Sequence, residues 1–126
     1  MATIHNKSET PWKTDKWYTS PWNFIPEVRA DMKFSPNIQF HDVSLRDGEQ
    51  QAGLIFNKDQ KVVIAEKLAE LGIQRIEAGM PVVSEQDAEA IKEIIKRNLG
   101  PQIFAFARCM KEDVKRSVDI GVKNIV

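Results

Sequence analysis

The 126-residue chain is 42% hydrophobic and carries 18 basic and 18 acidic residues, so it can build one compact core and has no net charge to attract nucleic acid or a membrane surface. Its single cysteine, Cys109, excludes an intramolecular disulfide and a C-x-x-C site. The N-terminal segment does not have the pattern of a secretory signal, and no apolar run reaches the roughly 18 residues of a membrane helix, so we expect a soluble cytoplasmic protein.

Residues 1–37 are interpreted as an irregular arm rich in aromatic residues and proline. They contain all three tryptophans and four of the six prolines, and neither helical nor alternating periodicity runs through them. Their aromatic side chains need a surface to cover, either the body of the same subunit or that of a partner. An aromatic platform for nucleic acid is the alternative, but it would need a basic stripe that the arm lacks.

From residue 38 onward, short apolar runs alternate with segments that have helix caps. We predict strands at residues 38–45, 73–80, 102–107 and 122–126. An order of β-α-β-α-β-α-β with short connections predicts parallel strands joined by right-handed crossovers.

Cap signals bound the helices between these strands. The first helix is expected to start after Asn57, with Gln60 three residues later, and to stop at Gly72. Ser84 with Asp87 has the same spacing at the start of the second helix. We expect that helix to end at Gly100-Pro101 and a third, shorter helix to cover residues 111–120.

Two architectures share this order of elements, an open doubly wound sheet and part of a (β/α)8 barrel. Val126 stops within an apolar run, whereas a whole barrel takes roughly 250 residues. The predicted fold is therefore α/β, the N-terminal half of a (β/α)8 TIM barrel, with the arm at residues 1–37 and the first β/α units at residues 38–126.

Charged residues gather where the first two strands end. Alternation places Asp42 and Arg46 on one face of the first strand, and Arg75 and Glu77 on one face of the second. Charges buried without partners are costly, so these side chains must pair, hydrate or bind a ligand. Because ligands of parallel α/β folds sit at the carboxyl ends of the strands, this is a candidate site.

The pattern leaves two interpretations of these charges open. In one, Arg46 pairs with Glu77 and Arg75 with Asp42, and the network only closes one end of the sheet. In the other, Asp47 is a hard oxygen ligand for a divalent metal, and Arg46 neutralises charge that develops on a substrate oxygen.

Other reactive side chains are weaker candidates. His41 is predicted to face away from the polar side and to be packed or hydrogen-bonded rather than catalytic. His5 is predicted to be solvated in the arm, and Cys109 to be a small buried hydrophobe. The chain has no G-x-G-x-x-G, P-loop, G-x-S-x-G or H-E-x-x-H string. The sequence therefore gives no motif for a nucleotide-binding protein, a serine hydrolase or a zinc protease of those classes.

The string HDVSLRDGEQQAGLIF, residues 41–56, resembles the signature D-x-[TS]-L-R-D-G-E-Q-x-x-G of the isopropylmalate, homocitrate and citramalate synthase family. That family belongs to the pyruvate carboxyltransferase-like, metal-dependent barrels. Residues 72–94 and 104–109 resemble its second strand and helix and the end of its third strand. The resemblance covers residues 38–126 and leaves the arm unexplained. It implies a homodimeric (β/α)8 enzyme that condenses acetyl-CoA with a 2-oxo acid.

The resemblance also implies roles for individual residues. Asp47 would ligate a divalent metal ion, with magnesium, manganese, zinc and cobalt all suitable. Arg46 would polarise the 2-oxo carbonyl and stabilise the oxyanion, and Gln50 would help to hold the 2-oxo acid. Glu77 would be a catalytic carboxylate near the metal and Arg46. A metal ion and a guanidinium directed at one carbonyl oxygen supply the electrostatic stabilisation that carbon–carbon bond formation needs.

This chain also departs from the family pattern. The family completes its metal site with an H-x-H motif, and the histidines here are His5 and His41 alone. We therefore expect the 126-residue piece by itself to be inactive. Two alternatives stay open. The first is a carbon–carbon lyase or aldolase on the same scaffold, against which the Glu49-Gln50 pair argues. The second is a non-catalytic half-barrel that associates with another chain through its strand edges.

Overall fold

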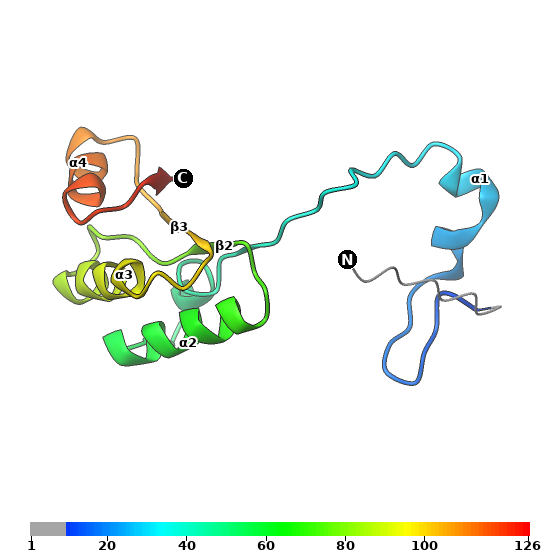
Figure 1. Cartoon of the computed structure of the whole chain (residues 1–126), viewed down its shortest axis with the longest axis horizontal. Coiled ribbons are helices and arrows are strands. Elements are labelled where there is room, and N and C mark those ends of the chain that lie inside the picture. The colour runs from blue at the N-terminus through cyan, green and yellow to red at the C-terminus, as the bar shows by residue number, and fades with distance from the viewer. Residues whose placement is uncertain (1–9) are drawn as a thin grey trace. The chain divides into compact units, whose positions relative to one another are not determined.

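The computed structural model describes residues 10–126, and the chain divides into two compact units between Asn37 and Ile38 (Figure 1). In the first unit, an antiparallel bridge joins Lys13 to Tyr18, and two short helices follow, η1 (Pro21–Phe24) and α1 (Pro26–Arg29). The ring of Trp12 packs against that of Phe24, with the ring centroids 6.1 Å apart. Other aromatic side chains of this unit are exposed, namely Trp17, Tyr18, Trp22 and Phe34.

The second unit is an α/β fold with one parallel sheet in the order β1-β2-β3-β4, which confirms the predicted strand order and direction. Its strands are β1 (His41–Asp42), β2 (Arg75–Glu77), β3 (Gln102–Ala105) and β4 (Asn124–Ile125). Its helices are η2 (Gly48–Gln50), α2 (Lys58–Glu70), α3 (Glu85–Arg97) and α4 (Lys111–Asp119). None of the helices in residues 10–126 is long and apolar enough to cross a membrane.

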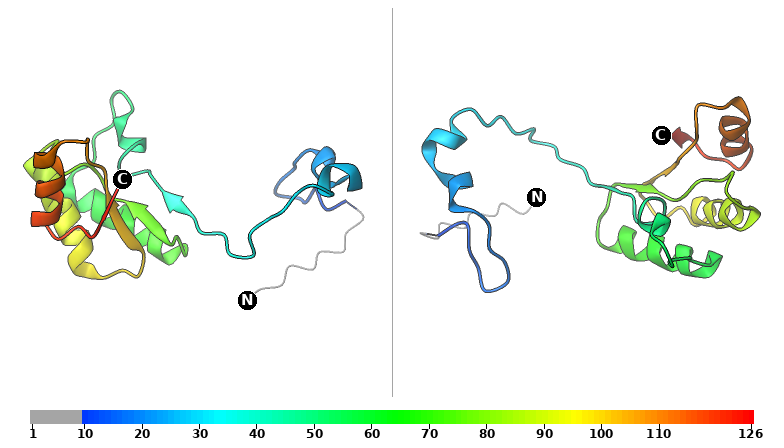
Figure 2. Two further views of the ribbon diagram at one scale, coloured as in Figure 1. Left: turned by 90° about the horizontal axis from the view of Figure 1, so that it is seen from above. Right: turned by 180° about the vertical axis from the view of Figure 1, so that it is seen from behind.

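The two faces of the sheet differ in chemistry. Ile76 of β2 and Ala105 of β3 are fully buried in the hydrophobic core, together with Ile91 and Ile94 of α3. Helices α2 and α3 pack side by side, and the helices gather on one side of the strands (Figure 2). Because neighbours across a sheet share a face and successive residues alternate, the other face carries polar side chains, including that of Glu77.

The first strand is shorter than predicted. Its predicted extent was residues 38–45, but β1 contains His41–Asp42 only. It ends early because the carbonyl of Val43 accepts hydrogen bonds from the backbone N–H groups of Arg46, Asp47 and Gly48 at 2.9–3.2 Å. These bonds wind residues 44–47 into a turn. The alternation expected as far as Arg46 therefore fails after Val43.

The predicted caps of the first two helices of this unit are confirmed. Asn57 Oδ1 accepts from the Gln60 N–H at 2.9 Å, and Gln60 Oε1 accepts from the Asn57 N–H at the same distance, which is a reciprocal capping box. Ser84 Oγ accepts from the Asp87 N–H at 3.0 Å. The end of α3 was placed too late: the helix stops at Arg97, because Asn98 adopts the left-handed conformation (φ 47°) before Gly100 is reached.

The ion pair between Asp113 and Arg108 makes the stability of the second unit depend on pH. Its side chain is 2% exposed and accepts two hydrogen bonds, from Arg108 Nε at 2.7 Å and from Arg108 Nη2 at 3.0 Å. These bonds are the main reason that the pKa of Asp113 lies below its ordinary value of 3.8.

We predict that Asp113→Asn lowers the free energy of unfolding at neutral pH, because the amide loses the charged bond to Arg108. Because the folded-state pKa is lowered, the carboxylate stabilises the fold above pH 3.8, and this contribution is lost as the pH falls through the folded-state value. Urea unfolding at pH 7 and at stepwise lower pH should show the gap between wild type and variant closing below pH 3.8. Asp119→Asn in the same helix is the control, and a gap independent of pH would contradict the assignment.

Candidate active site

The segment after β1, a turn and the short helix η2, carries three of the four predicted site residues. Arg46 and Asp47 lie in the turn itself, and Gln50 ends the η2 helix that follows. Gly48 starts η2 and lies against the turn, since a Cβ there would approach the Ser44 Cβ to 3.7 Å. The local hydrogen bonds to Val43 thus gather three polar side chains at the carboxyl end of β1.

Arg46 and Glu77 form a direct ion pair between the ends of β1 and β2. Glu77 is the last residue of β2 and is 2% exposed, and its Oε1 accepts from Arg46 Nε at 2.5 Å. Arg46 Nη1 also donates to Asp47 Oδ1 at 2.9 Å, and the guanidinium lies 4.9 Å from the centroid of the Phe106 ring. A carboxylate this deeply buried needs a cation beside it, and Arg46 supplies that cation.

The second predicted pair, Arg75 with Asp42, is wrong. The sheet register aligns Asp42 with Ile76 and His41 with Arg75, so the side chains of Asp42 and Arg75 point to opposite faces. Asp42 instead accepts hydrogen bonds from the N–H and the hydroxyl of Ser44, at 2.9 and 3.2 Å. Within residues 10–126, Arg75 Nε is buried without a hydrogen-bond partner.

The predicted orientation of His41 is wrong, although its ring is packed as expected, and the predicted burial of Cys109 is wrong as well. His41 shares the polar face with Glu77, and its Nε2 lies 3.4 Å from Glu77 Oε2 while its ring packs on Phe104 with centroids 4.9 Å apart. The sequence carries no signal for this contact, because it depends on how β1 and β2 align. Cys109 is exposed rather than buried, and His5 lies outside the described residues.

A cleft of about 320 Å³ lies between the loop after β1 and the loop after β2. Arg46 and Gln50 contribute polar groups to its lining, and most of the rest is apolar: Leu45, Leu54, Ile55, Met80 and Val83. The structure therefore brings Arg46 and Gln50 to one cavity. Asp47 is not part of the lining, and its side chain is 63% exposed next to Arg46.

Metal ligands are few in the described part of the chain. Residues 10–126 contain no group of three His, Cys, Asp or Glu side chains close enough to hold a metal ion. Asp47 offers carboxylate oxygens, which hard divalent cations prefer, and its Oδ1 already accepts from Arg46. The donor is suitable in kind, but one carboxylate does not make a coordination shell.

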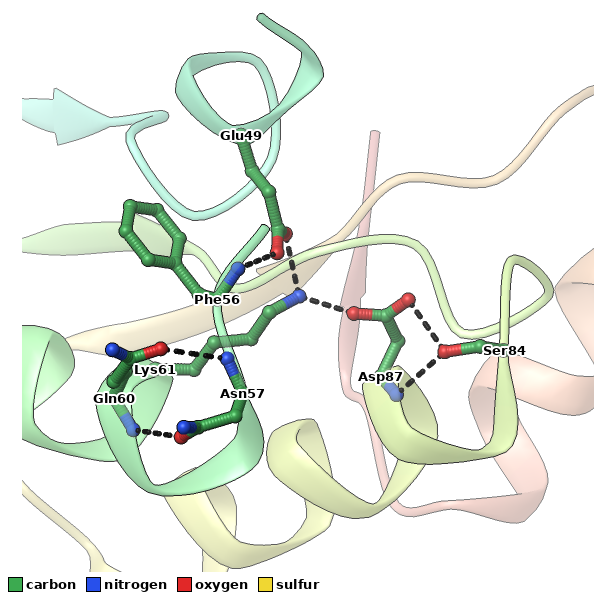
Figure 3. Close-up of polar contacts among 7 residues, drawn as sticks. All are labelled: Glu49, Phe56, Asn57, Gln60, Lys61, Ser84 and Asp87. Atoms are coloured by element: carbon green, nitrogen blue, oxygen red, sulfur yellow. Dashed lines mark hydrogen bonds and ion pairs between the residues drawn. The ribbon is translucent and has the colours of Figure 1, made fainter. Parts of the chain in front are cut away.

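Lys61 is the polar residue that the sequence analysis missed. It is 1% exposed, its Nζ lies 2.6 Å from Glu49 Oε2, and it also contacts Asp87 Oδ1 (Figure 3). One sequence signal was available, since Lys61 is followed at helical spacing by Ala65 and Leu68 and therefore falls on the apolar stripe of α2. A lysine in such a stripe needs buried partners.

Comparison with known proteins finds one matching family profile and two kinds of relative. The HMGL-like family profile matches residues 37–126. The chain is 39% identical over 111 residues to homocitrate synthase AksA of Methanothermobacter thermautotrophicus, covering 88% of this chain and 27% of that protein. It is also 39% identical over 118 residues to homocitrate synthase AksA of Methanocaldococcus jannaschii, covering 94% of this chain and 26% of that protein. To 2-isopropylmalate synthase of the same organism it is 37% identical over 108 residues, covering 86% of this chain and 21% of that protein. The chain thus spans about a quarter of the length of these relatives.

We predict that Glu77→Ala costs about 3 kcal/mol of unfolding free energy, because it leaves Arg46 partly buried without its nearest carboxylate. Glu93→Ala is the matched control, since Glu93 pairs with Arg97 on the exposed side of α3 and its loss should matter far less. Urea unfolding followed by circular dichroism measures both variants. An equal loss of unfolding free energy in the two variants would show that the Arg46–Glu77 pair stabilises the fold no more than an exposed ion pair does.

Proposed function

Because this chain belongs to the HMGL-like family, whose profile matches residues 37–126, we propose that it carries the first part of the catalytic domain of an acyl-CoA:2-oxo acid C-acyltransferase. The reaction would be the condensation of acetyl-CoA with a 2-oxo acid. Relatives named as homocitrate and 2-isopropylmalate synthases support this class of reaction. The observation that carries the proposal is the Arg46–Glu77 pair at the carboxyl ends of adjacent strands.

The proposed architecture is the first half of a (β/α)8 barrel in residues 38–126, preceded by the arm at residues 1–37. The strand order β1-β2-β3-β4 supports it, because every crossover among these strands steps in the same direction. A doubly wound sheet reverses its strand order at a switch point, whereas a barrel does not. The polar face that carries His41 and Glu77 would then line the barrel interior.

Arg46 is the residue that would stabilise the developing charge. In the condensation, a base outside the described residues would take a proton from the acetyl methyl carbon, which then attacks the 2-oxo carbonyl carbon, and the carbonyl electron pair moves onto the oxygen. That oxygen takes up a proton, and water then cleaves the thioester and frees the thiol of CoA. A guanidinium has five N–H donors, and the bonds to Glu77 and Asp47 use two of them. The remaining donors are available to that oxygen, and the two carboxylates hold the guanidinium in place before the reaction starts.

Gln50 and Asp47 would have supporting roles. The Gln50 amide lines the same cleft as Arg46 and would hold the 2-oxo acid there. Asp47 would contribute one oxygen ligand to a divalent metal ion whose other ligands come from outside the described residues. Such an ion, when bound, is a Lewis acid for carbonyl oxygens.

The first experiment is the intact mass of the protein made from its native gene, followed by an assay of that protein. A mass well above the 14.4 kDa of this chain is expected, because a catalytic barrel needs roughly 250 residues. Thiol release from acetyl-CoA should then depend on a 2-oxo acid and on a divalent metal ion. A mass of 14.4 kDa with no thiol release would favour the non-catalytic half-barrel, and cleavage of a carbon–carbon bond in place of condensation would identify a lyase.

We predict that Arg46→Lys lowers kcat on the order of 10²-fold or more in that assay. A lysine ammonium lacks the planar set of N–H donors with which a guanidinium can bind two carboxylates and an oxyanion at the same time. Arg97→Lys is the control, since Arg97 contacts Glu66 of α2 and Glu93 of its own helix α3 and does not line the cleft. A kcat for Arg46→Lys within a factor of two of the control would remove Arg46 from the reaction.

A further inference from the structure

Lys61 joins two segments of the chain that are far apart in sequence. Its Nζ reaches Glu49 of η2 at 2.6 Å and Asp87 in the first turn of α3 (Figure 3). Both carboxylates are largely buried, with 19% and 16% of their side chains exposed. One buried cation thus balances two acidic groups, and neither acid has an equally buried cation to replace it among the ion pairs of residues 10–126.

Each carboxylate also orders its own loop. Glu49 Oε1 accepts from the Phe56 N–H at 2.9 Å, which ties η2 to the start of α2. Asp87 Oδ2 accepts from the Ser84 hydroxyl at 2.8 Å, and Ser84 caps α3. Through the carboxylates of Glu49 and Asp87, Lys61 is therefore connected to both loops rather than to a single helix.

The two loops are the walls of the cleft that contains Arg46 and Gln50. Glu49 lies directly before Gln50 in η2, and Ser84 and Asp87 line the opposite side of the same cleft. Gly79, the second residue after Glu77, passes close to the cluster, since a Cβ there would lie 3.9 Å from Lys61 Nζ. The ammonium of Lys61 thus contacts one lining residue from each of the two loops, Glu49 and Asp87.

We propose that Lys61 is a positioning residue: by holding Glu49 and Asp87 together, it fixes the loop that carries Arg46, Asp47 and Gln50 relative to the end of β2. The chemical purpose of this positioning rests on the proposed function, but the positioning itself does not. A lysine that only stabilised the fold would leave the Arg46–Glu77 geometry intact whenever the protein is folded. The two roles therefore differ in a measurable way.

The test uses Lys61→Met in the protein made from its native gene, with Lys67→Met as the matched control. Lys67 lies on the same helix and pairs with Glu70 on the surface. The first readout is the NMR resonance of the Arg46 Nε–H, which donates to Glu77 at 2.5 Å. The second is amide hydrogen exchange at Phe56, whose N–H donates to Glu49, compared with the amide of Ala78 directly after β2, which donates to the Phe104 carbonyl at 2.9 Å.

In folded Lys61→Met we expect the Arg46 resonance to shift or vanish and exchange at Phe56 to accelerate more than tenfold relative to Ala78. Lys67→Met should change neither. An unchanged Arg46 resonance, or equal acceleration at Phe56 and Ala78, would overturn the proposal, because both results describe a lysine that acts on global stability alone.

Glu49→Gln and Asp87→Asn keep the proposal testable if Lys61→Met does not fold. Each leaves Lys61 with one carboxylate, so the site keeps its cation paired. Glu49→Gln should shift the Arg46 resonance and speed exchange at Phe56, whereas Asp87→Asn should shift the Arg46 resonance and leave Phe56 slow. If neither variant moves the Arg46 resonance, Lys61 does not position this loop.

Kinetics of the native-gene protein separate this inference from the proposed function. If that protein is a condensing enzyme, Lys61→Met should lower kcat/KM on the order of 10²-fold, as a displacement of about 1 Å does in other active sites, while Lys67→Met stays within a factor of two. If the protein condenses nothing, the proposed function fails, and the Arg46 resonance still decides whether Lys61 positions the loop.

Discussion

The buried carboxylate of Glu77 is the constraint on which the rest of the site depends. A carboxylate that is 2% exposed at the end of a strand must have a cation within reach, and Arg46 is that cation. Arg46 can reach Glu77 only because the chain leaves the extended conformation at Val43 and turns back. The shortness of β1 is therefore the condition that lets two strand ends share one ion pair.

The loop after β1 is held from two directions. Arg46 ties it to β2 through Glu77, and Glu49 ties it to α2 and α3 through Lys61. Between these two anchored residues the Asp47 side chain is exposed, and Gln50 follows directly and lines the cleft. Two side chains tied into buried ion pairs thus flank Asp47 and precede Gln50, and a binding site needs such support beside its contact groups.

Much of the second unit could be predicted from local patterns. Asn57 with Gln60 and Ser84 with Asp87 form the expected caps, because a cap involves residues three apart and needs no information about the rest of the fold. The strand ends were predicted less well, since hydrogen bonds to the Val43 carbonyl and not hydrophobic periodicity ended β1. The Arg46–Glu77 pair was one of two interpretations that the sequence left open.

The sequence by itself determined the order and type of the elements, the helix caps and the resemblance carried by residues 41–56, because each of these depends on residues close together in the chain. Only the tertiary structure decided that His41 and not Asp42 shares a face with Glu77, and that Lys61 binds Glu49 and Asp87. These contacts depend on sheet register and on the packing of α2 beside α3. A one-residue change in register reverses which side chains meet, and no local pattern in the sequence encodes it.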